Sequence, residues 1–148
     1  MFHPLSLIIP VLVLIPNLFF FLKSPVNIPA HQPKEPLLLT ILERLGQIGC
    51  FLIPLFYSVS YSGVFEILAS IAMAIMLVIY YYGWIRFFTH NREYRWLFYP
   101  LFSIPVPLAL SPVIYFLLSS VILHSYPILL SSLILAVGHI PVSLKSAQ

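Results

Sequence analysis

Glu43 and His139 lie inside long apolar runs of this chain, where ionisable side chains are rare. Glu43 and Gln47 are four residues apart, so on a helix they share one face. His139 lies in the last apolar run, and Arg86 lies near the end of the third. Ionisable groups at membrane depth are costly and usually point into a helical bundle. We therefore predict an intramembrane polar site made of Glu43, Gln47, Arg86 and His139.

Two roles are open for this group of residues. Glu43 can pair with Arg86, or with a basic residue of the 89–95 loop, and so fasten the second helix to the third. Alternatively, Glu43 can bind a proton or a substrate. His139 can likewise be a hydrogen-bonded packing residue or a proton relay. We favour the structural role for both, and we expect any functional site in the cytoplasmic half of the bundle, to which these residues map.

A second set of polar residues is basic and flanks the apolar runs. Arg44 follows Glu43 directly, and Arg92 and Arg95 belong to the segment THNREYR at 89–95, the most charged loop in the chain. Such residues usually determine membrane topology, and less often they bind a phosphate or a lipid headgroup. Arg44, Arg92 and Arg95 are therefore candidates for headgroup or anion binding.

Several kinds of chemistry find no support in the sequence. No two of the five histidines are three or four residues apart, and Cys50 is the single cysteine, so neither a metal site nor a disulfide is predicted. P-loop, nucleophile-elbow and dinucleotide motifs do not occur, and we expect no cofactor. The basic residues are scattered, which argues against a nucleic-acid partner. The sequence identifies no catalytic residue.

The composition indicates which solvent surrounds the chain. Of 148 residues, 61% are hydrophobic and 7% are charged, whereas soluble domains carry about 25% charged residues. The mean hydropathy is +1.03. A chain this apolar cannot cover a globule with polar surface, so we predict an integral membrane protein whose first partners are membrane lipids. Its spans must be helical, because an open strand would leave backbone groups unpaired in hydrocarbon.

The apolar runs predict an all-α, polytopic bundle that forms one domain over 1–148 and spans the cell membrane several times. A crossing needs about 20 residues, so the stretch 96–144 is divided in two at the sequence HSYP (124–127). The predicted helices cover about 5–22, 37–57, 65–88, 100–123 and 128–144. A four-helix bundle, in which the last part of the chain is partly interfacial, is the alternative.

The basic residues also predict the orientation of the bundle. With five helices, all seven Lys and Arg residues fall on one side. Positively charged flanks stay cytoplasmic, so we predict that the N-terminus is outside and the C-terminus inside. The four-helix alternative would separate Lys145 from the other basic residues.

Prolines and small residues predict how the helices bend and pack. Several of the 14 prolines lie inside the predicted spans; they can kink helices or break them as in transporters, and we favour kinks. The pairs Gly46/Cys50 and Ser70/Ala74, each four residues apart, predict close helix contacts. Hydroxyls are predicted to form hydrogen bonds between the fourth and fifth helices, namely those of Ser119, Ser120, Ser131 and Ser132.

Two classes of function are compatible with these features. We expect a small protein without an extramembrane domain that is not an enzyme, either transporter-like or an accessory subunit of a membrane complex. Transport through so small a bundle would require self-association, so a homo-oligomer or a membrane-complex partner is expected. The alternative is a membrane-embedded enzyme acting on a lipid or isoprenoid phosphate, with arginines holding the headgroup and Glu43 or His139 as general acid or base. Few carboxylates lie on that side, which favours the first class.

Overall fold

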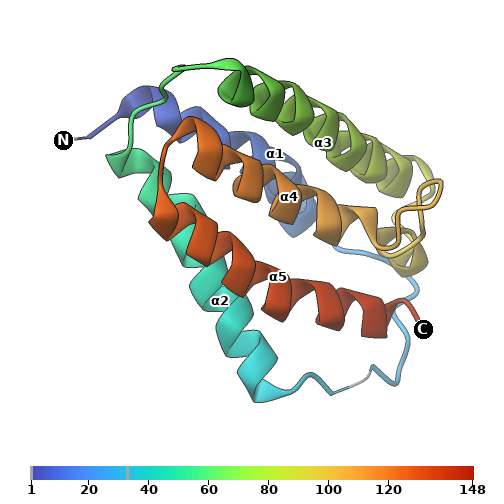
Figure 1. The fold of residues 1–148 in the computed structure, drawn as a ribbon. Coiled ribbons are helices and arrows are strands. Elements are labelled where there is room, and N and C mark those ends of the chain that lie inside the picture. The colour runs from blue at the N-terminus through green and yellow to red at the C-terminus, as the bar shows by residue number, and fades with distance from the viewer. Residues whose placement is uncertain (1, 33) are drawn as a thin grey trace.

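The protein is a bundle of α-helices, shown in Figure 1. The computed structural model describes residues 2–32 and 34–148; Met1 and Pro33 of the predicted domain lie outside them. Within this part of the chain there are five α-helices: α1 (Ile8–Leu22), α2 (Leu37–Leu52), α3 (Val64–Thr89), α4 (Pro107–Ile122) and α5 (Tyr126–Ser146). Short 3₁₀ helices, Pro4–Leu7, Ile53–Phe56 and Tyr94–Leu97, precede α1 and follow α2 and α3. The all-α, five-helix prediction is confirmed.

Four of these helices are long and apolar enough to cross a membrane, counting the adjoining 3₁₀ turns of α1 and α2. The exception is α4, whose 16 residues extend about 24 Å at 1.5 Å per residue. It is also the most enclosed helix, because α3 lies on one side of it and α5 on the other (Figure 1). A helix that neighbouring helices cover need not match the thickness of the lipid by itself.

The fourth helix begins at Pro107 and not near residue 100, so the predicted start was wrong. Prolines at 100, 105 and 107 disfavour helical backbone in the residue before each of them. The chain instead makes a tight reversal in which Leu101 and Ile104 exchange backbone hydrogen bonds. Val106 then adopts a left-handed conformation with φ of 40°. Pro107 occupies the first helical turn, where its missing N–H costs no hydrogen bond.

The helices α2 and α5 pack unusually closely, and glycines make this possible. A Cβ atom added at Gly46 would lie 2.6 Å from Leu135 Cα, and one added at Gly138 would lie 2.7 Å from Glu43 Cα. Cys50, one turn from Gly46, is fully buried. The predicted close contact through Gly46 and Cys50 is therefore confirmed.

The pair on the third helix does not make such a contact. Ala74 is exposed, and Ser70 donates a hydrogen bond to the carbonyl of Glu66 in its own helix. Helix α3 packs through a different face that carries larger side chains, among them Met73, Tyr80 and Phe87. The prediction from the Ser70/Ala74 spacing was wrong, because spacing alone does not say which face of a helix meets its neighbour.

The serines of α4 and α5 bond within their own helices. Each hydroxyl donates to a carbonyl three or four residues earlier, and this holds for Ser119, Ser120, Ser131 and Ser132. The predicted hydrogen bonds between the two helices are not formed. The same helices, with α1, run without interruption through Pro16, Pro112 and Pro141. The prolines therefore leave no broken helix at these positions.

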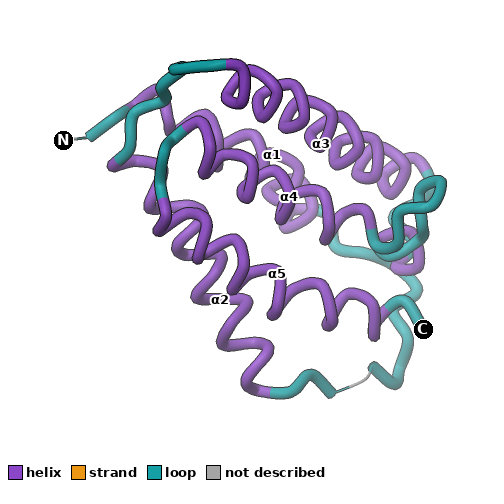
Figure 2. Tube along the Cα trace, in the orientation of Figure 1, coloured by secondary structure: helices purple, strands orange, loops and turns teal. Residues whose placement is uncertain are grey.

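Loops gather at two opposite ends of the bundle (Figure 2). We call one the basic end; it contains the loop after α1, the 90–106 loop and the end of α5. There, backbone bonds join Val26 to Arg92 and Tyr94. We call the other the Glu66 end; it contains residues 2–6, 57–63 and 123–125. There, Ser60 N–H donates to the carbonyl of Ile122. The helices connect the two ends alternately.

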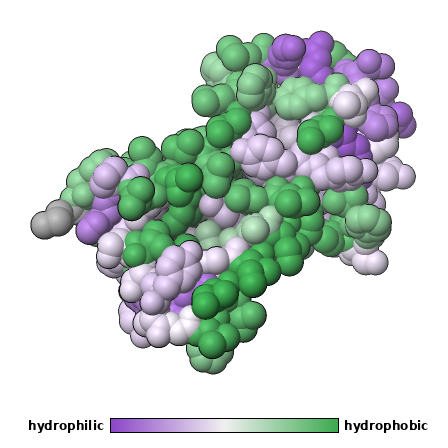
Figure 3. Space-filling view, turned by 90° about the horizontal axis from the view of Figure 1, so that it is seen from above, coloured by the Kyte–Doolittle hydropathy of each residue, from purple (hydrophilic) through white to green (hydrophobic). Residues whose placement is uncertain are grey.

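Large hydrophobic side chains cover much of the outer surface. Phe19, Phe21 and Leu22 on α1 and Phe65 and Val78 on α3 are more than half exposed. Seen from above, the molecule is largely hydrophobic, and hydrophilic residues gather most strongly on the side where the loop after α3 lies (Figure 3). Exposed apolar surface of this extent is typical of helices that contact lipid or another apolar partner.

Candidate functional site

The two ionisable residues singled out in the apolar runs meet in the structure. Glu43 on α2 and His139 on α5 lie across the helix pair, and His139 Nδ1 is 2.8 Å from Glu43 Oε1. Close packing positions them, because Gly138, next to His139, lets the α5 backbone approach Glu43. Both side chains are largely buried, with 17% of Glu43 and 27% of His139 exposed. They form the centre of the candidate site.

Two further side chains of α2 extend this contact into a chain of hydrogen bonds. Gln47 Nε2 donates to Glu43 Oε1 at 3.2 Å. The guanidinium of Arg44 donates in turn to Gln47 Oε1 at 3.4 Å. Glu43 Oε1 thus accepts from both an amide and an imidazole, which fixes its position. The structure brings together three of the four residues of the predicted site, Glu43, Gln47 and His139, and the direct contact between Glu43 and His139 was not predicted.

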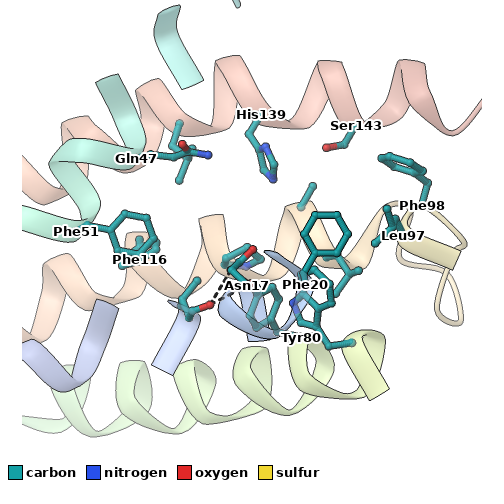
Figure 4. Close-up of a pocket in the computed structure, with 16 residues that line it drawn as sticks. Asn17, Phe20, Gln47, Phe51, Tyr80, Leu97, Phe98, Phe116, His139 and Ser143 are labelled. Carbon is teal, nitrogen blue, oxygen red and sulfur yellow. Dashed lines mark hydrogen bonds between the residues drawn. The ribbon is translucent and has the colours of Figure 1, made fainter. Parts of the chain in front are cut away.

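Next to this pair lies a cavity of about 220 Å³ to which all five helices contribute side chains. Gln47 and His139 line it from α2 and α5, and Asn17 and Tyr80 line it from α1 and α3 on the opposite side (Figure 4). Most of the remaining wall is apolar, and Phe20, Phe51, Trp84, Leu108 and Phe116 contribute to it. An apolar cavity with a few converging polar groups is the usual form of a small-molecule site.

The wall across from His139 carries its own polar network. Asn17 Nδ2 donates to the Tyr80 hydroxyl at 2.7 Å and to the carbonyl of Val13 at 2.8 Å. Tyr81 donates to the carbonyl of Leu12. The bonds of Asn17 to Tyr80 and of Tyr81 to Leu12 tie α1 to α3. Sequence reasoning missed Asn17, although a lone amide inside an otherwise apolar run is a signal that could have identified it.

The geometry defines which atoms a ligand can reach. Glu43 occupies Nδ1 of His139, so Nε2 is the ring nitrogen left for a molecule in the cavity. With the proton on Nδ1, Nε2 accepts a hydrogen bond; a second proton turns it into a donor. The arrangement can therefore bind a polar group on a mainly apolar molecule, or accept a proton from it.

Arg86, the fourth residue of the predicted site, lies elsewhere. Its guanidinium donates to the carbonyls of Pro100, at 3.0 Å, and Tyr99. It also lies over the rings of Trp96 and Tyr99, 5.2 and 5.4 Å from their centres. The prediction that Glu43 pairs with Arg86 or with the following loop was wrong. Arg86 instead anchors the 94–100 segment, because its guanidinium contacts the carbonyls and aromatic rings that follow α3.

The three residues predicted to bind a headgroup or an anion also contact different parts of the structure. Arg44 bonds to Gln47, and Arg95 forms an ion pair with its neighbour Glu93 at 2.7 Å. Arg92 donates to the carbonyl of Ser24 in the loop after α1. The three residues do not form one cluster. Among the described residues, His, Cys, Asp and Glu side chains form no group of three or more that could hold a metal ion.

A second carboxylate–histidine pair lies at the Glu66 end. Glu66 is 6% exposed, accepts a hydrogen bond from Ser62 at 2.6 Å, and lies 3.4 Å from His124. It belongs to the first turn of α3, where the partial positive charge of the helix stabilises a carboxylate. Sequence reasoning gave this pair no role.

Comparisons with protein families, with curated proteins and with solved structures each found no match to this chain.

Proposed function

We propose that this is a multi-pass protein of the cell membrane that binds a small, mainly apolar molecule in the cavity among its five helices and acts without catalysis. The N-terminus lies outside and the C-terminus lies in the cytoplasm. Binding of this kind suits a transporter-like protein or an accessory subunit of a membrane complex. The observation that carries the proposal is the cavity beside the Glu43–His139 contact.

The membrane location is supported by the outer surface and by the two ends. Four helices have the length and hydropathy of a crossing, and exposed side chains on α1 and α3 are apolar. The basic end carries Lys23, Arg92 and Arg95, and basic flanks stay cytoplasmic. The Glu66 end carries a glutamate and histidines in place of Lys and Arg.

The chemical class of the ligand follows from the cavity wall. Aromatic and aliphatic side chains form most of it, so the molecule is mainly apolar. His139 Nε2 and Asn17 Oδ1, which take no part in the hydrogen bonds described above, select a ligand with one or two hydrogen-bonding groups. A strongly charged ligand fits less well, because the nearest carboxylate is engaged with His139 and Arg86 is held by the 94–100 segment.

One observation favours an enzyme as the second candidate. A carboxylate that holds a histidine by Nδ1 is the arrangement of a general base. A lipid or isoprenoid phosphate substrate would also need a cation at the cavity, and the cavity is lined by neither lysine nor arginine. The binding function therefore agrees better with the residues present.

The test is to identify small molecules that copurify with the protein in mild detergent. The Ala109→Leu variant fills the cavity from α4, whereas Ala74→Leu adds the same atoms to the exposed face of α3. We expect organic extracts of the wild type and of Ala74→Leu to contain the same apolar species. The extract of Ala109→Leu should contain several-fold less of it.

Ser143→Leu, which fills the cavity from α5, provides a second variant should Ala109→Leu fail to fold. Equal recovery of every bound species from the cavity-filled and the control proteins would contradict the proposal. Accumulation of a lipid phosphate in a Glu43→Gln variant, absent from the wild type, would support the enzyme instead.

A further inference from the structure

A separate groove runs along the outside of the bundle between α1 and α3. Its volume is about 520 Å³. The walls are mainly apolar and aromatic, with Ile15, Pro16 and Phe19 from α1 and Tyr81, Trp84, Ile85 and Phe88 from α3. Trp84 lines both this groove and the cavity among the five helices. The groove lies on helices that the membrane location exposes to lipid.

Two cationic side chains, Lys23 and Arg92, line the same groove. Lys23 follows the last residue of α1, and Arg92 lies in the loop after α3. Among the described residues, neither forms an ion pair with a carboxylate, because the nearby Glu93 is paired with Arg95. Both positive charges are therefore free to meet an anion.

The backbone holds these two cations at the basic end of the groove. Val26 N–H donates to the Arg92 carbonyl, and Tyr94 N–H donates to the Val26 carbonyl, both at 2.9 Å. The guanidinium of Arg92 donates to the Ser24 carbonyl at 3.2 Å. A guanidinium has five N–H donors, so most remain for a ligand. The loops after α1 and α3 are thus joined where the two charges lie.

We propose that the groove between α1 and α3 binds one anionic phospholipid from the surrounding membrane. An acyl chain lies along the apolar wall, and the phosphate lies between Lys23 and Arg92. The position of Lys23 and Arg92 at the ends of α1 and α3 agrees with this, because basic residues at the cytoplasmic edge of a span attract anionic lipids. A zwitterionic lipid fills the same apolar wall but brings no net charge to the two cations. The site rests on the membrane location and is independent of the interior cavity.

Native mass spectrometry of delipidated protein tests this site. Phosphatidylglycerol and phosphatidylcholine of equal chain length are added in turn. We expect one phosphatidylglycerol to be retained in preference to phosphatidylcholine, and the preference should fall roughly thirtyfold in Lys23→Gln/Arg92→Gln, on the scale of two basic residues at a membrane surface. The control Lys34→Gln/Lys145→Gln removes the same charge at exposed positions outside the groove and should keep the preference.

A second comparison tests the apolar wall. Ile85→Trp fills the groove, and Ile75→Trp adds the same ring at an exposed position of α3 that does not line it. Lipid retention should fall for the first variant only. An equal loss of preference in both charge variants would overturn the site, as would binding that inorganic phosphate displaces completely. Failure of the groove test leaves the copurification test of the cavity unaffected.

Discussion

Two carboxylate–histidine pairs occur in the described part of this protein, and they differ in what surrounds them. Glu43 and His139 join two packed helices, are 2.8 Å apart, and are both largely buried. Glu66 and His124 are 3.4 Å apart at the start of α3, and half of the His124 side chain is exposed. The first pair borders a cavity that all five helices line. The second joins the 57–66 segment to the turn after α4.

The same two residue types therefore have different roles in the two regions. At the Glu66 end the carboxylate needs no histidine to be stable, because Ser62 and the first turn of α3 already favour its negative charge. Glu43 lacks a helix terminus of this kind and depends on His139 and Gln47. We therefore expect stability to depend strongly on the first pair and weakly on the second.

Glycine substitutions should show the largest difference between the two regions. At Gly138 an added Cβ would lie 2.7 Å from Glu43 Cα, and at Gly63 the nearest atom would be Glu66 Oε2 at 3.5 Å. We expect Gly138→Ala to lower the free energy of unfolding in detergent by about 1–3 kcal/mol through overpacking. Gly63→Ala should stay within about 0.5 kcal/mol of the wild type. Equal losses would show that α2 and α5 are not packed closely.

Coupling energies should show the next largest difference. In a double-mutant cycle of Glu43→Ala and His139→Ala, we expect a coupling of about 0.6–1.7 kcal/mol, the range for hydrogen bonds between membrane helices. The cycle of Glu66→Ala and His124→Ala should give less than about 0.5 kcal/mol, because its histidine is half exposed. Urea or detergent unfolding measures both cycles. A larger coupling at the Glu66 end would reverse the comparison.

The smallest effect is expected for substitutions of Arg86, because Arg86 belongs to neither carboxylate–histidine pair. Arg86→Lys loses the paired contacts with the carbonyls of Tyr99 and Pro100, and we expect a loss of about 1 kcal/mol. Combined with Glu43→Ala, the losses should add to within about 0.5 kcal/mol, as for sites without shared partners. Thermal unfolding of the two single variants and the double variant provides the measurement. Non-additive losses would mean that Arg86 and Glu43 interact after all.

Much of the fold could be predicted from the sequence, because apolar runs and basic flanks are features of whole segments. The ranges predicted for the first, second, third and fifth helices agree closely with the structure. The start of α4 could not be placed by hydropathy, since residues 100–106 are nearly as apolar as a helix. Their prolines carried the signal that α4 begins at Pro107.

The site could be predicted only in part, because its partners are far apart in sequence. The spacing of Glu43 and Gln47 was enough to place them on one face. Which residue faces Glu43 depends on how α2 and α5 cross. The periodicity of a single helix does not predict how it crosses another helix. Arg86 was assigned to Glu43 from the depth of Glu43 and from the basic residues that end the third helix, whereas its real partners are the carbonyls of Tyr99 and Pro100, 13 and 14 residues along the chain.

We expect the basic end and the Glu66 end to lie on opposite faces of a membrane. Ser24 and Ser58 are exposed residues at the two ends, so each can be changed to cysteine in a Cys50→Ala background with little disturbance. A membrane-impermeant maleimide is then added to intact cells. We expect Ser58→Cys to be labelled and Ser24→Cys to be labelled only after the cells are lysed. Labelling of Ser24→Cys in intact cells, or equal labelling at both ends, would contradict this arrangement.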